Sequence, residues 1–140
     1  MKHDRYATRY VGKLSNKLRR KIDAFAGNES FSGAEGRVLH FVLSQSDDVF
    51  QKDIEEEYCM RPATASQLLK KMENNGLINR IAVANDGRKK KIVVSEDALK
   101  YKEKVMDNIT SLEDTLTKNI DEKDLEVFLK VAEKMISNLS

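Results

Sequence analysis

The segment from residue 61 to residue 91 constrains the fold most, because a helical pattern runs directly into a hairpin pattern within it. Pro62 suits the first turn of a helix, where its missing N–H costs nothing, and Gly76 is the expected end of that helix. Two alternating, β-branched stretches follow, and Asn85-Asp86-Gly87 between them tolerate the positive φ angles of a tight turn. The segment therefore predicts a helix followed by a two-stranded hairpin. The predicted strands are Leu77 to Ala84 and Lys89 to Val94.

Positive charge is concentrated in the same segment, which holds eight Lys or Arg residues against two acids and carries a net +6, although the whole chain is only +2. The flanking stretches 1–30, 31–60 and 92–140 carry +5, −5 and −4. Duplex DNA is a dense line of phosphates, so a protein that binds it needs clustered cations rather than a high overall charge. A solvated surface of alternating charge is the other interpretation. The basic residues are Arg61, Lys70, Lys71, Arg80, Arg88, Lys89, Lys90 and Lys91.

Length and composition favour one mainly helical domain. The 140 residues are enough to bury a core, and a single proline with six glycines leaves few breaks in helices. No run of about 18 apolar residues is present, and the N-terminal residues lack the apolar stretch of a signal peptide, so the chain is expected in the cytoplasm. One cysteine, Cys59, excludes an internal disulfide framework and agrees with a reducing compartment.

Helices are expected on both sides of this segment. The first, over residues 6–25, has an apolar stripe and ends at Gly27-Asn28; Ser32 and Glu35 make a capping box for a second. A short third helix covers Gln51 to Tyr58. Beyond the hairpin, two further amphipathic helices are predicted at 96–118 and at 121–139, the latter capped by Asp121.

The helix after Pro62 divides into two faces. Its apolar stripe, which should be buried, consists of Ala65, Leu68, Leu69 and Met72. Small and hydrogen-bonding residues occupy the opposite face, where close approach to base edges would be needed. They are Ala63, Gln67, Lys70 and Asn74, flanked by Thr64, Ser66 and Lys71.

In these residues the chain resembles the MarR (multiple antibiotic resistance regulator) family of bacterial winged helix-turn-helix transcription regulators. The similarity lies in the run from Ala63 to Glu73, in Gly76-Leu-Ile-Asn-Arg80, and in the wing Asp86-Gly-Arg88 followed by Ile92-Val-Val-Ser95. Family wings often read Asp-Arg-Arg, so Gly87 is a departure that removes one basic contact or shifts it to Lys89. The order and length of the elements match over nearly the whole chain.

The resemblance implies a mainly α fold with a small β-hairpin wing. Residues 31–95 would be the DNA-binding lobe of a single domain, and residues 1–30 and 96–140 would be dimerisation helices. The apolar stripes of the terminal helices give an independent reason for a homodimer, because a winged unit of about 60 residues is too small to cover them all. Packing of these helices on their own winged unit is the alternative.

Two recognition helices of such a dimer would enter successive major grooves, about 34 Å apart, on a pseudo-palindromic operator. Gln67 suits adenine and Lys70 suits guanine or phosphate. Ala63 could touch a thymine methyl group. Thr64 and Ser66 complete the predicted base contacts, and Arg61 and Lys71 are assigned to phosphates. By the resemblance, Arg88 would enter the minor groove and Asp86 would hold it there. Lys89 and Lys91 would attract the DNA backbone. The other interpretation of Arg88 is a solvated charge in a turn.

The resemblance also implies gene control by exclusion of polymerase, more commonly repression, and release by a small aromatic or phenolic ligand. The residues themselves do not decide repression against activation, and they assign no effector pocket. A winged-helix protein-interaction module or antirepressor, which uses its basic wing on an acidic protein, is the competing function.

The cysteine, the histidines and the acidic run say less about function. Cys59 lies beside the predicted recognition helix, where it is either a redox-sensitive thiol or a small hydrophobe; the second interpretation is favoured. His3 and His40 are far apart and predict no metal site, and no cofactor is expected. Consecutive acids at 55–57 point in different directions round a helix, so they predict a solvated face rather than a catalytic pair. No nucleophile–base pair or phosphate-binding glycine loop is visible, and no enzymatic activity is expected.

Overall fold

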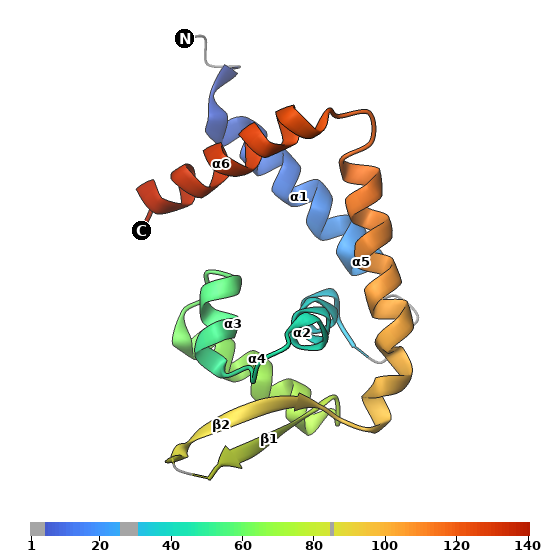
Figure 1. The fold of residues 1–140 in the computed structure, drawn as a ribbon, viewed down its shortest axis with the longest axis vertical. Helices are drawn as coiled ribbons and strands as arrows, with labels where there is room; N and C mark the ends of the chain where they lie inside the picture. Colours follow the sequence, from blue (N-terminus) through green and yellow to red (C-terminus); the bar gives the residue numbers. More distant parts are fainter. Residues whose placement is uncertain (1–4, 26–30, 85) are drawn as a thin grey trace. The chain divides into compact units, whose positions relative to one another are not determined.

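The computed structural model describes residues 5–25, 31–84 and 86–140. The predicted helix end at Gly27-Asn28, the turn residue Asn85 and His3 lie outside the described residues. Contacts divide the chain into two compact units, residues 1–108 and 109–140. The elements are α1 (Ala7–Phe25), α2 (Gly33–Ser44), α3 (Gln51–Glu57), α4 (Pro62–Asn74), β1 (Ile78–Val83), β2 (Asp86–Val94), the 3₁₀ helix η2 (Asp97–Tyr101), α5 (Lys102–Leu116) and α6 (Glu122–Asn138) (Figure 1).

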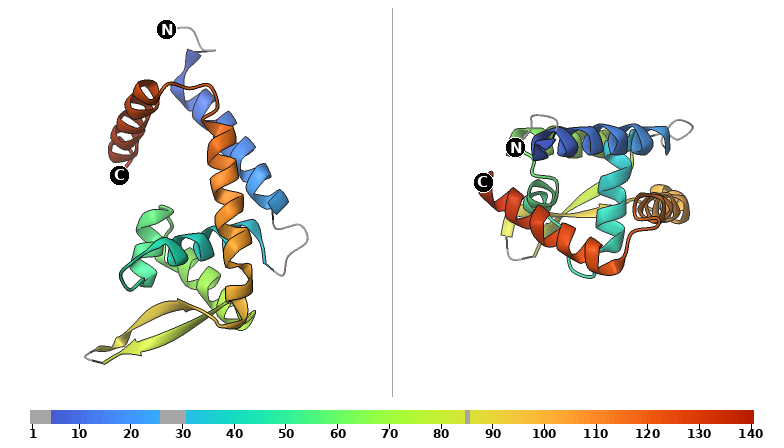
Figure 2. Two further views of the ribbon diagram at one scale, coloured as in Figure 1. Left: turned by 45° about the vertical axis from the view of Figure 1, so that its right-hand side comes forward. Right: turned by 90° about the horizontal axis from the view of Figure 1, so that it is seen from above.

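The core of the first unit joins α2, α3, α4 and the hairpin. From α4, Ala65, Leu69 and Met72 are fully buried and Leu68 is half-buried, which confirms the predicted stripe. Ile54 of α3 is fully buried as well. Since α4 buries one face only, its opposite face stays in solvent. The hairpin extends away from α4 in the left view of Figure 2. The remaining fully buried large side chains are Val38, Leu39 and Ile78.

The start of α2 is fixed by a capping box and by a close helix contact. The Glu35 N–H donates to Ser32 Oγ at 3.2 Å, and the Ser32 N–H donates to Glu35 Oε1 at 2.9 Å, as the sequence predicts. Gly33 lies against the backbone of α1: an added Cβ would be 3.1 Å from Asp23 Cα and 3.1 Å from Asp23 N. A side chain at position 33 would therefore crowd α1, and glycine allows this approach of α1 and α2.

Gly76 ends α4 and starts the hairpin, as predicted. It adopts a φ of +75°, the left-handed conformation that glycine tolerates best. The Leu77 N–H donates to the Met72 carbonyl at 2.9 Å and the Gly76 N–H to the Glu73 carbonyl at 3.1 Å, which together form a Schellman motif. Ser95, which follows β2, closes the base of the hairpin, because its Oγ donates to the Gly76 carbonyl at 2.6 Å.

The hairpin is less regular than its sequence predicts. β1 and β2 pair antiparallel, with Ile78 opposite Val94 and Ala82 opposite Lys90, but Val83 is opposite Asp86. Three residues, 87–89, therefore lie between the partners of two consecutive β1 residues and form a bulge in β2. Asp86 and Gly87, which were predicted as turn residues, belong to the strand instead.

After the hairpin, the chain enters a short 3₁₀ helix rather than the α-helix predicted from residue 96. The Ala98 N–H donates to Ser95 Oγ at 3.0 Å, which tightens this first turn. Ala98 and Val105 are buried, whereas Leu99 between them is 46% exposed. The tighter 3₁₀ winding changes which side chains face inward.

The second unit contains the C-terminal part of α5 and all of α6. Asn119 adopts a φ of +62° in the turn between them, a conformation that Asn tolerates well. Asp121 is the N-cap residue of α6, as predicted, but its side chain makes no capping hydrogen bond. No residue of α6 is buried. In the part of the chain that the structure describes, none of the helices has the length and apolar character needed to cross a membrane.

Candidate nucleic-acid interface

α4 presents a continuous polar face to solvent. Gln67 and Lys70 lie on the side opposite Ala65, Leu69 and Met72, so burial of the apolar stripe fixes where they point. Arg61 is the N-cap residue and precedes Pro62 at the first helical position. The predicted site residues of this helix are all exposed: Arg61, Ala63, Thr64, Ser66, Gln67, Lys70 and Lys71.

The turn between α3 and α4 sets the orientation of this face. The Met60 N–H donates to the Glu55 carbonyl at 2.9 Å and the Cys59 N–H to the Glu56 carbonyl at 3.5 Å, so α3 also ends in a Schellman motif. Cys59 occupies the left-handed position, with a φ of +50°. Gln51 Nε2 donates to the Pro62 carbonyl at 3.3 Å and thereby ties the start of α3 to the start of α4.

At its other end, α4 is tied to α2 and to β1. Asn75 Nδ2 lies 3.5 Å from Oε2 of the buried Glu35, and Arg80 Nη2 pairs with Glu73 Oε1 at 3.4 Å. Because α4 is held at both ends, its exposed face is presented by a rigid element. Among the described residues, no ion pair involves the two lysines of this face, Lys70 and Lys71, so their charges are available to a phosphate.

The basic residues of the hairpin have different surroundings. Lys89 Nζ lies 4.4 Å from the ring centroid of Phe50, and Lys91 Nζ lies 4.0 Å from Asp48 Oδ1. Arg88 is exposed and lies in the bulge. The side chain of Asp86, predicted to hold Arg88, lies outside the described side chains. α4 and the hairpin are consecutive elements of the first unit, so the structure brings the two groups of predicted site residues into one lobe.

Sequence reasoning missed the two neighbours of the hairpin lysines, Asp48 and Phe50. Val49 between them forms an antiparallel bridge with Ile92, and the Ile92 N–H donates to the Val49 carbonyl at 2.7 Å. This pairing places the segment before α3 beside β2. No local pattern in the sequence indicates it, because the two segments are far apart in the chain.

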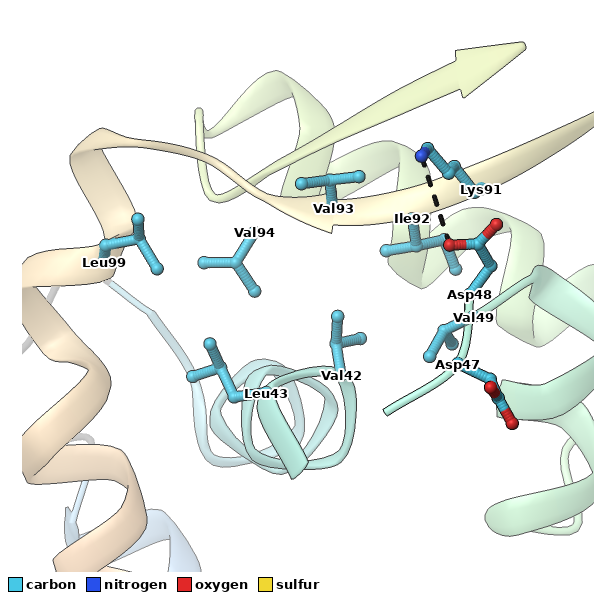
Figure 3. Close-up of a pocket in the computed structure, with 10 residues that line it drawn as sticks. All are labelled: Val42, Leu43, Asp47, Asp48, Val49, Lys91, Ile92, Val93, Val94 and Leu99. Carbon is cyan, nitrogen blue, oxygen red and sulfur yellow. Dashed lines mark ion pairs between the residues drawn. The ribbon is translucent and has the colours of Figure 1, made fainter. Parts of the chain in front are cut away.

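A hollow of about 340 Å³ opens between the C-terminal part of α2, the α2–α3 turn and β2 (Figure 3). Its walls are aliphatic, and its polar end holds Asp47, Asp48 and Lys91, two of which form the ion pair drawn in the figure. No group of three or more His, Cys, Asp or Glu residues within the described ranges is arranged to hold a metal ion. The aliphatic wall residues are Val42, Leu43, Val49, Ile92, Val93, Val94 and Leu99.

A second cluster joins α2 to α3. Tyr58 Oη donates to the Arg37 carbonyl at 2.6 Å, and the Arg37 guanidinium lies 4.9 Å from the centre of the Tyr58 ring. Phe41 packs edge-on against the same ring. Burial raises the pKa of Tyr58 to about 12, and burial lowers the pKa of His40, on α2, below its usual value of 6.5.

Solved structures similar to this one come from MarR-type regulators. S. aureus MepR in a DNA-binding conformation is 26% identical, with 96% of this chain and 100% of that chain covered and a TM-score of 0.85. The S. aureus MepR–DNA complex is also 26% identical, with coverages of 96% and 99% and a TM-score of 0.82. The transcription regulator MarR from Oenococcus oeni is 22% identical, with coverages of 94% and 99% and a TM-score of 0.87, and supports the fold alone. Comparison with curated proteins gives no matching relative.

A sequence model of the MarR family matches residues 30–89. Over these 60 of its 140 residues, the chain is similar to the MarR family. The resemblance expected from the sequence is therefore confirmed, and so is the fold class, a mainly helical winged helix-turn-helix with an antiparallel hairpin. In the terms of this family, α3 and α4 form the helix-turn-helix and β1–β2 is the wing. The matched span contains every predicted site residue except Lys91, and the protein is, by class, a DNA-binding transcription regulator.

Proposed function

We propose that this MarR-family protein is a homodimeric repressor that binds a pseudo-palindromic operator in double-stranded DNA and is released by a small aromatic or phenolic ligand. The observation that carries the DNA-binding part is the exposed polar face of α4, on a fold that resembles the S. aureus MepR–DNA complex over 96% of this chain. Because the apolar face of α4 is buried in its own lobe, the polar side chains on the opposite face are exposed to solvent. They are therefore available to a duplex.

Base recognition is assigned to α4. Gln67 can donate and accept two hydrogen bonds with adenine in the major groove, and Lys70 can reach guanine or a phosphate. Thr64 and Ser66 carry hydroxyl groups that suit either base edges or phosphates. Ala63 is small enough to contact a thymine methyl group.

Phosphate contacts set the register of α4 on the duplex. Arg61, at the start of the helix, and Lys71, near its end, are exposed and suit this role. In the wing, Arg88 is assigned to the minor groove with Asp86 as its support, and Lys89 is assigned to the backbone. Lys91 would share its charge with Asp48, so it contributes less.

Exposed apolar side chains support the homodimer. On α6, Val127 is 60% exposed and Phe128 is 51% exposed, and on α1 Val11 is 55% exposed. Exposed apolar side chains in such number are costly in water, and a two-fold partner would bury them. A mass near 16 kDa by light scattering at micromolar concentration, instead of about twice that value, would refute the dimer. Further exposed residues are Tyr10, Leu14, Leu129, Val131, Met135, Ile136 and Leu139.

Repression follows if the dimer and polymerase compete for one promoter. Two α4 helices related by two-fold symmetry would read half-sites about 34 Å apart, which requires a pseudo-palindrome. A ligand that favours another spacing of the two α4 helices would release the operator, because it shifts the population of dimers away from the DNA-binding arrangement.

Fluorescence anisotropy tests the proposal. The full chain is titrated onto a labelled duplex from upstream of its own gene and onto a scrambled duplex, across a series of salt concentrations. Tighter binding to the upstream duplex that persists near 0.15 M salt supports a sequence-specific regulator. Equal, salt-sensitive binding to both duplexes would show a basic surface alone. Absence of binding to either, with co-purification of an acidic protein, would favour the protein-interaction function.

A further inference from the structure

The ring of Phe50 lies beside Lys89, one of the basic side chains of the wing. We infer that Phe50 is a positioning residue for the wing cation Lys89: its ring holds the ammonium group in place for a phosphate before DNA arrives. The inference rests on the proposed DNA-binding function. Its physical basis is the distance of 4.4 Å between Lys89 Nζ and the centre of the Phe50 ring, within the range of a cation–π interaction.

Phe50 is itself firmly held. Its N–H donates to Asp53 Oδ2 at 2.8 Å, and its carbonyl accepts from the Asp53 N–H at 3.0 Å and the Ile54 N–H at 3.4 Å. It is the N-cap residue of α3, so both of its backbone groups are committed to the start of that helix. The preceding residue, Val49, is buried and bridged to Ile92 of β2. The backbone that carries the aromatic ring is therefore fixed beside the wing.

Lys89, in contrast, receives little support from its own strand. It lies in the bulge formed by residues 87–89, between the β2 residues that pair with Ala82 and Val83. A regular ladder alternates its side chains between two faces, but a bulge interrupts this alternation and leaves the direction of its residues to other contacts. For Lys89 that contact is the ring of Phe50, which comes from a different part of the lobe.

Preorganisation of a lysine changes affinity because immobilising a long, flexible side chain at an interface carries an entropic cost. With Phe50 present, part of that cost is met when the protein folds. Lys90 offers a matched control: it is exposed on the same strand and pairs with Ala82 within the regular ladder. A loss of Phe50 should therefore affect the contribution of Lys89 and not that of Lys90.

A double-mutant cycle in the full-length protein tests this, with anisotropy on the preferred duplex as the readout. Phe50→Leu keeps an apolar side chain and should weaken binding about three- to tenfold, the effect of losing one ordered side chain. The same substitution should have almost no further effect in a Lys89→Met background, and its full effect in a Lys90→Met background. Phe50→Tyr, which keeps the aromatic face, should bind like the parent.

Three results would overturn the inference. An equal loss from Phe50→Leu in both lysine backgrounds would mean that Phe50 acts through packing alone. If Phe50→Tyr binds DNA as weakly as Phe50→Leu, the aromatic face is irrelevant. Thermal unfolding of each variant shows whether the lobe is intact. If the unsubstituted chain shows no sequence-specific, salt-dependent binding, the proposed function fails and the inference fails with it. Binding by the parent without coupling refutes the inference alone.

Discussion

The two left-handed residues that bracket α4 give a prediction with a calculable size. Gly76 has a φ of +75° and no atom within 4 Å of an added Cβ, so Gly76→Ala changes the backbone energy and nothing else. A left-handed conformation costs an L-residue about 1–2 kcal/mol. Loss of glycine's freedom in the unfolded chain returns about 0.4–1 kcal/mol. The free energy of unfolding should therefore fall by about 1 kcal/mol.

Cys59 adopts the same left-handed conformation as Gly76, but here a substitution to glycine should raise stability rather than lower it. It is exposed and adopts a φ of +50°, so Cys59→Gly removes the backbone cost and should raise the free energy of unfolding by about 1 kcal/mol. Cys59→Ala is the matched control, because alanine keeps the left-handed cost and removes only the thiol. The two sites lie at opposite ends of a 13-residue helix, about 20 Å apart, so the double variant Cys59→Gly/Gly76→Ala should unfold near the parent.

Urea denaturation at one fixed protomer concentration measures these changes, since the stability of a dimer depends on concentration. With an unfolding entropy of about 2.1 cal/mol/K per residue, 1 kcal/mol corresponds to a shift of roughly 3 °C in Tm for a chain of this length. A Cys59→Gly variant that unfolds at lower urea than Cys59→Ala would refute the reasoning, because it would show that the α3–α4 turn gains from a side chain at that position.

Further predictions concern packing, pH and DNA. Gly33→Ala places a methyl group against the α1 backbone and should lower the free energy of unfolding by about 1–3 kcal/mol in urea, whereas Gly12→Ala, with no atom within 4 Å, should not lower it. Burial raises the pKa of Tyr58 to about 12, so its contribution to stability is complete below pH ~10 and is lost as the pH rises toward 12. Tyr58→Phe should flatten the fall of the unfolding free energy with pH in alkaline urea titrations. An unchanged slope would contradict the assignment. Arg88→Ala should weaken DNA binding more than tenfold in anisotropy, and unchanged affinity would remove the wing from the interface. Gln67→Ala should change base preference in a panel of mutated duplexes; a uniform loss would make it a phosphate contact.

Features with a local cause could be predicted from the sequence. The stripe of Ala65, Leu69 and Met72 repeats with the period of a helix, and glycine, at position 76, is the residue that best suits a left-handed helix end. The capping box of Ser32 and Glu35 is a three-residue spacing. Each of these depends on neighbours within one or two turns, so the order of the amino acids contains the information.

Features that depend on distant contacts could not be predicted. The 3₁₀ turn at residues 97–101 comes after Ser95, whose Oγ is held by the distant Gly76 carbonyl. The bulge in β2 has no signal in a strand that looks regular. Cys59 is not a residue that the left-handed conformation favours, so its position was unexpected. The contact of Phe50 with Lys89 and the ion pair of Asp48 arise only when the segment before α3 pairs with β2.

Selection of bound duplexes from a randomised pool, followed by hydroxyl-radical footprinting of the enriched sequence, tests the central claim most directly. The account predicts an enriched pseudo-palindrome with two protected half-sites about one helical turn apart on one face of the DNA. Protection should weaken at one half-site when the bases assigned to α4 there are changed. A pool that shows no enrichment at physiological salt, or a footprint with a single unsymmetrical site, would contradict it.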